Sequence, residues 1–169
     1  LAEVLRVDRK SAEVVLELQP AEGSLDHRPG QFVQVSVFGY GEIPISICST
    51  PTGKRSFKLC VRPVGNVSRA LYELSAGDTA GVRGPYGQGF PVLKMQGRDV
   101  LVIAGGIGLA PLRSLIHYVR DNRQDYGRLI VIYGARAPAF ILFENDIEKW
   151  ANDPGMEWIV TVNEADENW

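Results

Sequence analysis

The sequence contains few of the residues that build metal centres, disulfide frameworks, nucleic-acid interfaces or membrane spans. Its 169 residues include two cysteines and two histidines. The formal net charge of -2 excludes the broad basic surface that nucleic-acid phosphates require. No apolar run approaches the roughly 20 residues that cross a bilayer. The first residues also lack the basic segment followed by an apolar segment that is typical of a signal peptide. We therefore expect a cytoplasmic protein with no membrane span and no nucleic-acid partner.

The cysteines and histidines are too dispersed to predict a metal site. Cys48 and Cys60 lie in strand-like runs and lack the short C-x-x-C spacing of zinc and redox sites. His27 and His117 lie far apart in the sequence. We expect no metal site, and we expect both cysteines to be small buried side chains. The alternative for the cysteines is a reactive thiol beside a redox cofactor.

The periodicity of apolar residues changes in the second half of the chain. Up to about residue 94 short strand-like runs alternate with turn residues, with a helical period only near residues 67–74. Six such strands predict a closed or nearly closed antiparallel barrel. From Asp99 onward strands alternate with helices, which predicts a parallel sheet with right-handed crossovers. The predicted strands are Val4–Val7, Ala12–Leu18, Gln31–Val37, Ile45–Ser49, Ser56–Val61, Thr79–Arg83, Val100–Ile103, Leu129–Tyr133 and Trp158–Val162.

The predicted fold class is β + α/β, with an N-terminal antiparallel barrel over residues 1–96 and a partial parallel-sheet domain over residues 97–169. A doubly wound nucleotide domain orders its strands 3-2-1-4-5-6, and this sequence supplies only the first three. That order leaves Val100–Ile103, a continuously apolar strand, at an edge. We therefore expect either that the chain is truncated at its C-terminus or that a partner subunit covers this edge.

A glycine-rich stretch follows that apolar strand. Gly105, Gly106 and Gly108 precede Pro111 at the mouth of an amphipathic segment, which is typical of a strand, a tight loop and a helix start. Glycines let backbone N–H groups approach a ligand, and a helix start supplies unpaired N–H donors. The spacing differs from the G-x-G-x-x-G fingerprint, so the loop alone leaves a nucleotide site and a tight turn equally open.

The ordered set of motifs resembles the ferredoxin-NADP reductase family of flavoproteins across nearly the whole chain. In that family an antiparallel flavin-binding barrel precedes a dinucleotide-binding domain. The motifs that carry the resemblance are Arg28-Pro-Gly-Gln-Phe32, Ile43-Pro-Ile-Ser-Ile-Cys-Ser49, Gly65-Asn-Val-Ser-Arg-Ala-Leu71, Gly81-Val-Arg-Gly-Pro-Tyr-Gly87 and Gly105-Gly-Ile-Gly-Leu-Ala-Pro111. The third resembles the family's pyrophosphate-binding turn, and the last resembles its nicotinamide-side loop.

The second motif departs from the family pattern at two positions. Ile43 replaces the arginine that pairs with the flavin phosphate, and Ile45 replaces the aromatic residue that stacks on the flavin ring. Losing a guanidinium removes the best bidentate phosphate partner. Arg62 and Arg69 are candidates to supply that charge, or are solvated surface residues. Ser46 is retained, so its hydroxyl is the candidate to hydrogen-bond the reactive edge of the flavin.

Two further segments, Phe38-Gly-Tyr-Gly-Glu-Ile-Pro-Ile-Ser46 and Tyr133-Gly-Ala-Arg136 with Phe143 beyond it, resemble one branch of the family. This branch contains gamma subunits of cytoplasmic nickel-iron hydrogenases (sulfhydrogenases). Electron-transfer subunits of anaerobic sulfite reductase and dihydroorotate dehydrogenase are close to it. The resemblance implies FAD, the usual family choice over FMN, and NAD or NADP. It implies electron transfer between NAD(P)H and the iron-sulfur and catalytic subunits of a larger redox complex. A [2Fe-2S] cysteine cluster of that branch is expected only in sequence outside this chain.

The resemblance also implies the site residues. Ser46 is the predicted catalytic residue, and Arg136, after the second parallel strand, is the candidate for the adenosine end of NAD(P), with a surface cap as its alternative. Two other functions stay open, a free-standing NAD(P)H flavin reductase and a non-catalytic assembly module. The predicted cofactor-binding residues are Pro44, Ile45, Ser46, Arg62, Gly65, Val67, Ser68, Gly84, Gly87, Gly105, Gly106, Gly108, Pro111 and Arg136.

Overall fold

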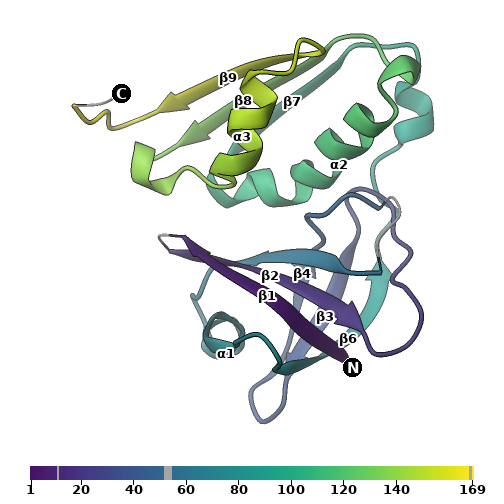
Figure 1. Ribbon diagram of the computed structural model, residues 1–169, viewed down its shortest axis with the longest axis vertical. Coiled ribbons are helices and arrows are strands. Elements are labelled where there is room, and N and C mark those ends of the chain that lie inside the picture. The colour runs from purple at the N-terminus through teal and green to yellow at the C-terminus, as the bar shows by residue number, and fades with distance from the viewer. Residues whose placement is uncertain (11, 52–54, 168) are drawn as a thin grey trace.

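The first half of the chain forms six antiparallel strands that curl around one apolar core (Figure 1). The computed structural model describes residues 1–10, 12–51, 55–167 and 169. The strands occur in the order β4-β3-β6-β1-β2-β5, and one helix, α1 (Asn66–Glu73), packs on them. The strand bounds are β1 Ala2–Lys10, β2 Glu13–Pro20, β3 Phe32–Val37, β4 Gly41–Ser46, β5 Phe57–Val61 and β6 Thr79–Tyr86.

Alternation of apolar side chains places one face of each long strand inside the barrel. On β2, Val14, Leu16 and Leu18 are fully buried, as expected for a strand with one face toward a core. The two end strands meet through Ile47 and Leu59, which form an antiparallel bridge between the segment after β4 and strand β5. This bridge nearly closes the sheet, so the predicted antiparallel barrel is confirmed.

One strand of the barrel lies earlier than the sequence pattern predicts. The predicted strand Ile45–Ser49 is β4, which runs over Gly41–Ser46 and pairs with β3 from Phe32 opposite Ser46 to Val37 opposite Gly41. The tight hairpin after Val37 fixes this register, whereas the apolar run that motivated the prediction continues past the strand. Pro44 fits within β4 because β4 is an end strand of the sheet, where a missing N–H is tolerated.

The second half forms a three-stranded parallel sheet in the order β7-β8-β9, as predicted (Figure 1). Its core contains the tryptophan of the second long helix, Trp150, which is 1% exposed, together with buried side chains of the strands. The strands are β7 Val100–Gly105, β8 Leu129–Ala135 and β9 Met156–Val162; the helices are α2 Leu109–Asp121 and α3 Glu144–Ala151. Short 3-10 turns are η1 Val92–Met95, η2 Gly106–Gly108, η3 Arg123–Asp125 and η4 Pro138–Phe140.

The parallel sheet is covered on one face only. Val100 and Val102 of β7 pack with side chains of α2 and α3 in the core. On the opposite face Leu101 is 57% exposed, Ile103 is 65% exposed and Ile159 of β9 is 52% exposed. Strand β7 stands at the edge of the sheet, as predicted, and the structure adds that one apolar face of the sheet is uncovered there.

The connection between the halves already packs on the second core. Val92 of η1 is 8% exposed and belongs to the core of the parallel half. The predicted boundary lies later, between residues 96 and 97, and it stays a prediction.

In the part of the chain that the structure describes, no helix is long and apolar enough to cross a membrane.

Candidate functional site

A hollow lies between the barrel and the glycine-rich loop of the second half, and we call it the cofactor hollow. Its volume is about 540 Å³, which is in the range of small-molecule sites. The barrel supplies most of the wall, and Ile107 of η2 completes it. The two halves of the chain therefore build one site. The lining residues are Tyr40, Ile43, Ile45, Cys60, Arg62, Val64, Gly65, Asn66, Val67, Ser68 and Ile107.

Helix α1 begins at the wall of the cofactor hollow. The N–H of Arg69 donates to the carbonyl oxygen of Gly65 at 2.9 Å, so the N–H groups of Asn66, Val67 and Ser68 precede the first intrahelical bond. Gly65 has φ -130, and an added Cβ would meet nothing closer than 3.9 Å. The fold itself therefore does not require a glycine there. Backbone donors, the positive end of a helix and a missing side chain fit a phosphate group.

The hydroxyl of Ser68 fixes the turn that precedes α1. It accepts hydrogen bonds from the N–H groups of Val64 at 3.0 Å and Gly65 at 2.8 Å. It donates to the carbonyl oxygen of Gly65 at 3.1 Å. Ser68 is 6% exposed, so its hydroxyl serves the fold, and only its backbone N–H is available for the predicted phosphate contact.

Strand β4 places two isoleucines on the cofactor hollow. Ile43 and Ile45 line the hollow, and their apolar faces suit the flat ring of a flavin. Pro44 and Ser46 alternate with them along the strand and point to the other face. Neither lines the hollow, and the predicted contacts of Pro44 and Ser46 with a flavin stay predictions.

The positive charge of Arg62 is largely compensated inside the protein. Arg62 lines the cofactor hollow, but its Nε donates to Oε1 of Glu13 at 2.7 Å, and its Nη2 contacts the same oxygen. Glu13 is 2% exposed. A buried carboxylate that depends on one arginine holds that arginine in place, so Arg62 contributes less charge to a phosphate than its position in the sequence predicts.

The predicted nicotinamide loop lies between β7 and α2. Gly105 ends β7, and Gly106 and Gly108 bound η2. Pro111 is in the first turn of α2, where its missing N–H is tolerated. A Cβ added at any of these three glycines would meet nothing within 4 Å. Open space therefore lies over this loop, as the predicted ligand role requires, and that role stays a prediction.

Gly84 and Gly87 instead serve the fold of the barrel. Gly84 has φ +138, and an added Cβ would lie 3.2 Å from a methyl group of Val33 and 3.3 Å from the carbonyl oxygen of Phe32. Gly87 has φ +85 and lies against the Phe32 ring. Neither glycine lines the cofactor hollow. They shape the turn at the end of β6, and a direct contact with a cofactor stays a prediction.

Arg136 lies beyond the end of β8, away from the cofactor hollow. Its Nε lies 3.3 Å from Oε1 of Glu164, and its guanidinium carbon lies 5.9 Å from the Phe140 ring centroid. The Arg136 side chain is 69% exposed, so it is accessible to a ligand. Its predicted role at the adenosine end of a dinucleotide stays open, and its partner Glu164 would have to release it.

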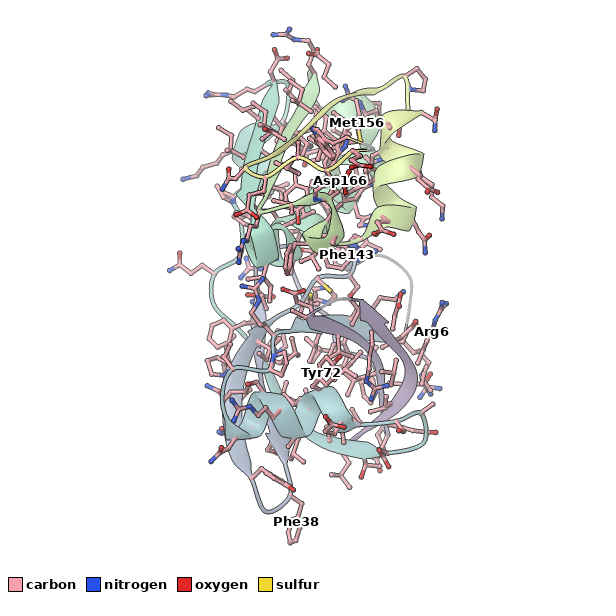
Figure 2. All side chains as sticks on the ribbon, turned by 90° about the vertical axis from the view of Figure 1, so that its left-hand side faces the viewer. Arg6, Phe38, Tyr72, Phe143, Met156 and Asp166 are labelled. Carbon is pink, nitrogen blue, oxygen red and sulfur yellow. The ribbon has the colours of Figure 1, made fainter. Side chains whose placement is uncertain are left out.

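Arg113 of α2 joins the second half to the barrel. Its Nη1 donates to the carbonyl oxygen of Cys48 at 2.5 Å, and its Nε donates to Asp146 of α3 at 2.7 Å. The guanidinium also lies over the ring of Phe143, which Figure 2 shows at the junction. Burial raises the pKa of Asp146, but His117 and Arg113 outweigh it and hold that pKa well below its usual range. This buried pair holds the glycine-rich loop against the barrel.

The cysteines lie at the same junction. Cys48 is fully buried and Cys60 is 5% exposed, and both pack with Ala110 and Leu142. Burial raises the pKa of the Cys48 thiol to about 11, and burial also raises the pKa of Cys60. Both thiols are therefore protonated and weakly reactive near neutral pH. No group of histidines, cysteines and carboxylates that could hold a metal is found among the described residues.

Six residues that line the cofactor hollow were not among the predicted cofactor-binding residues, and one of them, Ile43, was named only as the replacement of a family arginine. Ile107 lies within the glycine-rich motif, and Asn66 lies within the motif that begins at Gly65. Both would have been predicted if every residue of these motifs had been taken as a candidate. Tyr40 lies in the quoted segment before β4. Val64 carried no signal for a ligand in the sequence, and Cys60 was considered only under the alternative of a thiol beside a redox cofactor. They reach the hollow because β5 and the turn after it run beside β4.

The two halves of the chain match two models of oxidoreductase domains. The family described as oxidoreductase FAD-binding domain matches residues 1–90, and the oxidoreductase NAD-binding domain matches residues 102–169. The chain resembles the FAD/NAD-binding domain of nitric oxide dioxygenase from Vibrio cholerae with a TM-score of 0.85 and 19% identity. That comparison covers 98% of this chain and 75% of the other. It supports the fold alone.

Two curated relatives from Pyrococcus furiosus are more similar in sequence. The gamma subunit of sulfhydrogenase 1 is 45% identical over 84% of this chain and 49% of its own length. A probable electron-transfer subunit of dihydroorotate dehydrogenase B (NAD(+)) is 35% identical over 83% of this chain and 50% of its own length. The chain thus spans about half the length of these relatives. With the FAD-binding domain model matching more than half of its residues, the chain belongs to the family of oxidoreductases that join an FAD-binding domain to an NAD-binding domain.

Proposed function

We propose that this chain is the FAD-binding and NAD(P)H-linked electron-transfer part of a larger redox complex, such as a hydrogenase. The observation that carries the proposal is the cofactor hollow itself. Its apolar strand wall and helix start come from the FAD-binding half, and Ile107 of the glycine-rich loop comes from the NAD-binding half. A site shared in this way brings a flavin and a nicotinamide together.

The proposed position of FAD follows from the chemistry of the wall. Ile43 and Ile45 contact the flat ring, and the free N–H groups at the start of α1, among them those of Val67 and Ser68, hold the pyrophosphate. The glycine at position 65 leaves room for the phosphate to approach the backbone. These features fit the group without the arginine that Ile43 replaces, because backbone donors replace side-chain charge.

Bound FAD supplies the chemistry, because a flavin accepts a hydride and releases electrons singly. The chain supplies position and shelter. Gly105, Gly106 and Gly108 leave space for a nicotinamide over the loop, and Ile107 brings the loop to the cofactor hollow. Arg113 and Asp146 fix the distance between the halves. Ser46 lies on the other face of β4 from Ile43 and Ile45, so its hydroxyl is not among the groups proposed to contact the ring.

The partners are proposed from the relatives and from the uncovered sheet. The relatives are named as subunits of a sulfhydrogenase and of a dihydroorotate dehydrogenase, which favours an iron-sulfur and a catalytic subunit as partners here. We propose that further polypeptide covers the apolar face around Leu101 and Ile103 and that a [2Fe-2S] centre lies outside these residues. Free buried cysteines are in keeping with the cytoplasm.

Anaerobic spectroscopy tests the proposal. The chain is loaded with FAD and mixed separately with NADH and NADPH, and the flavin absorbance is followed before and after a [2Fe-2S] ferredoxin is added. We expect one nucleotide to bleach the flavin faster, and we expect the ferredoxin to restore the absorbance as it is reduced. A chain that takes up no flavin, or a bound flavin that neither nucleotide reduces, would contradict the proposal and favour an assembly module.

A further inference from the structure

Two pairs of opposite charge join strands β2 and β5 of the barrel. Glu17 of β2 lies opposite Lys58 of β5 in the register of the two strands, and the Lys58 Nζ lies 3.4 Å from Oε2 of Glu17. Glu13 begins β2, and its Oε1 accepts a hydrogen bond from Nε of Arg62, directly after β5. The two pairs therefore connect the same strands by similar chemistry, about one helical turn's worth of sequence apart.

One of these two pairs reaches the cofactor hollow. Arg62 lines the hollow, whereas neither Glu17 nor Lys58 does. Glu13 is 2% exposed, while the side chains of Glu17 and Lys58 are 20% and 32% exposed. The charge of Glu13 therefore acts through protein rather than through water, where it is screened far less. The pair of Glu17 and Lys58 is a natural control for it.

The buried carboxylate of Glu13 depends on Arg62. Its Oε1 takes both contacts of the guanidinium, at 2.7 Å from Nε and close to Nη2. Among the described residues, Oε2 of Glu13 is buried without a hydrogen-bond partner. Arg113 borders the same cavity as Glu13, but it is paired with Asp146 at 2.6 Å. Arg62 is thus the counter-ion of a buried charge and is held to it.

The charges of this pair also act on the wall of the cofactor hollow. Cys60 lines the hollow between the two strands' charged pairs. Burial is the main cause of the raised pKa of its thiol, and the negative charge of Glu13 raises that pKa further. The positive charge of Arg62 acts on the same thiol in the opposite direction. A ligand against this wall is therefore exposed to both charges, and their effects oppose one another.

Reduction of a flavin changes the charge beside this pair. Two electrons and one proton leave one extra negative charge on the flavin ring. A positive charge nearby stabilises that product and raises the midpoint potential of the flavin, whereas a compensated positive charge does so much less. Because Glu13 compensates Arg62, the hollow offers the reduced ring little net positive charge from this side.

We infer that Glu13 is a positioning residue that keeps the midpoint potential of the bound flavin low by holding and compensating Arg62. The inference rests on the proposed function and adds a residue that sets how readily the flavin passes its electrons on. Glu13 does not line the hollow and acts through Arg62. A low potential favours transfer from the flavin to an acceptor over retention of the electrons on the flavin.

The midpoint potential of FAD bound to the chain tests the inference, measured by anaerobic reductive titration against a reference dye. Glu13→Gln keeps the size of the side chain and an acceptor oxygen but removes the charge. We expect the ratio of reduced to oxidised flavin at a fixed potential to rise about tenfold, which is a shift of about +30 mV for a two-electron couple. The double variant Glu13→Gln/Arg62→Gln is neutral again and should return to within about twofold of the unmodified chain.

The neighbouring pair supplies the matched control. Glu17→Gln removes a carboxylate from the same strand, paired across the same two strands but away from the cofactor hollow. Because its pair is more exposed, the ratio should change by less than about twofold. Should Glu13→Gln fail to fold, Glu13→Met replaces the charge with an apolar side chain of similar length, and the same rise is expected.

The possible results separate the two claims. Equal potentials in the unmodified chain and in the Glu13 variant would overturn the inference and leave the proposed function intact. A rise that persists in the double variant would also overturn it, because the effect would then not act through Arg62. A rise of the same size in Glu17→Gln would show a general effect of surface charge and overturn it too. A chain that binds no flavin would contradict the proposed function and the inference together.

Discussion

Two turns of this chain are rich in glycine for different physical reasons. In the turn of the barrel, Gly84 and Gly87 have positive φ angles and lie against Phe32, so the fold itself requires glycine. In the loop of the parallel half, side chains at Gly105 and Gly108 would meet no atom within 4 Å, and both residues have ordinary φ angles. The protein's own packing accounts for the first pair and leaves the second unexplained.

The comparison indicates how structural and ligand-binding glycines can be separated. A glycine with a strained φ or a close neighbour is explained by the fold. A glycine with neither leaves backbone exposed for something outside the chain. Gly65 at the start of α1 belongs to the second class, and it lies on the wall of the cofactor hollow.

The largest loss of unfolding free energy is expected at the junction between the barrel and the parallel half. Arg113→Met leaves Asp146 buried without its arginine and removes the donor to the Cys48 carbonyl oxygen. Breaking a buried ion pair costs about 3–5 kcal/mol, measured as the free energy of unfolding in urea. The matched control is Arg120→Met, which breaks the more exposed pair with Asp153 and should cost about 1 kcal/mol or less. Equal losses in the two variants would contradict the role of Arg113.

Gly84→Ala tests directly whether the barrel turn requires its glycine and the loop of the parallel half does not. An alanine at φ +138 is strained, and its Cβ approaches Val33 and the carbonyl oxygen of Phe32. The expected loss of unfolding free energy is about 1–3 kcal/mol, measured by urea denaturation. Gly105→Ala, in the open loop, should change stability by about 0.5 kcal/mol or less. Similar losses in both variants would remove the distinction between the two turns.

The junction should also be sensitive to acid. The pKa of Asp146 is lower in the folded chain than in the unfolded one, so its stabilising contribution is present above the unfolded value and disappears as the pH falls through the folded value. We expect the unfolding free energy to fall below about pH 4. In Arg113→Met this part of the acid dependence should weaken, because only His117 then lowers the pKa of Asp146. Unfolding curves from neutral to acidic pH measure it, and an unchanged dependence in the variant would refute the assignment.

No loss of stability is expected at Gly108→Ala. Gly108 has φ -61, which alanine adopts without strain, so the variant should be as stable as the unmodified chain or up to about 1 kcal/mol more stable. The added methyl group stands in the proposed nicotinamide space, so reduction of bound FAD by NADH or NADPH should slow. Stopped-flow absorbance measures that rate, and an unchanged rate would place the nicotinamide elsewhere.

Much of the fold follows from local patterns in the sequence. Alternating apolar residues such as Val14, Leu16 and Leu18 predicted the strands of the barrel, and the change of period predicted the parallel half. Strand β4 was predicted too late because its register depends on the hairpin after Val37, which apolar periodicity does not encode. The position of β7 at the edge of the sheet was predicted from the strand order, whereas the uncovered apolar face of the sheet was not.

The candidate site was predicted in part, where a local motif carries it. Gly65, Val67 and Ser68 lie on the cofactor hollow because the turn before α1 is itself the site. Glu13 is distant from Arg62 in the sequence, so the ion pair between them could not be predicted from local motifs. Tyr40 reaches the hollow only through the close approach of its hairpin to α1, which requires the folded barrel.

Titration with FAD of the unmodified chain and of Gly65→Phe tests the central claim most directly. A Cβ at position 65 would meet nothing closer than 3.9 Å, and Gly65 lines the cofactor hollow, so a phenylalanine there is expected to occupy space that FAD needs. We expect the unmodified chain to bind FAD stoichiometrically, and we expect Gly65→Phe to lose at least about tenfold in affinity with an unchanged unfolding transition. Equal affinity in the two proteins would contradict the account, because FAD would then bind outside the cofactor hollow.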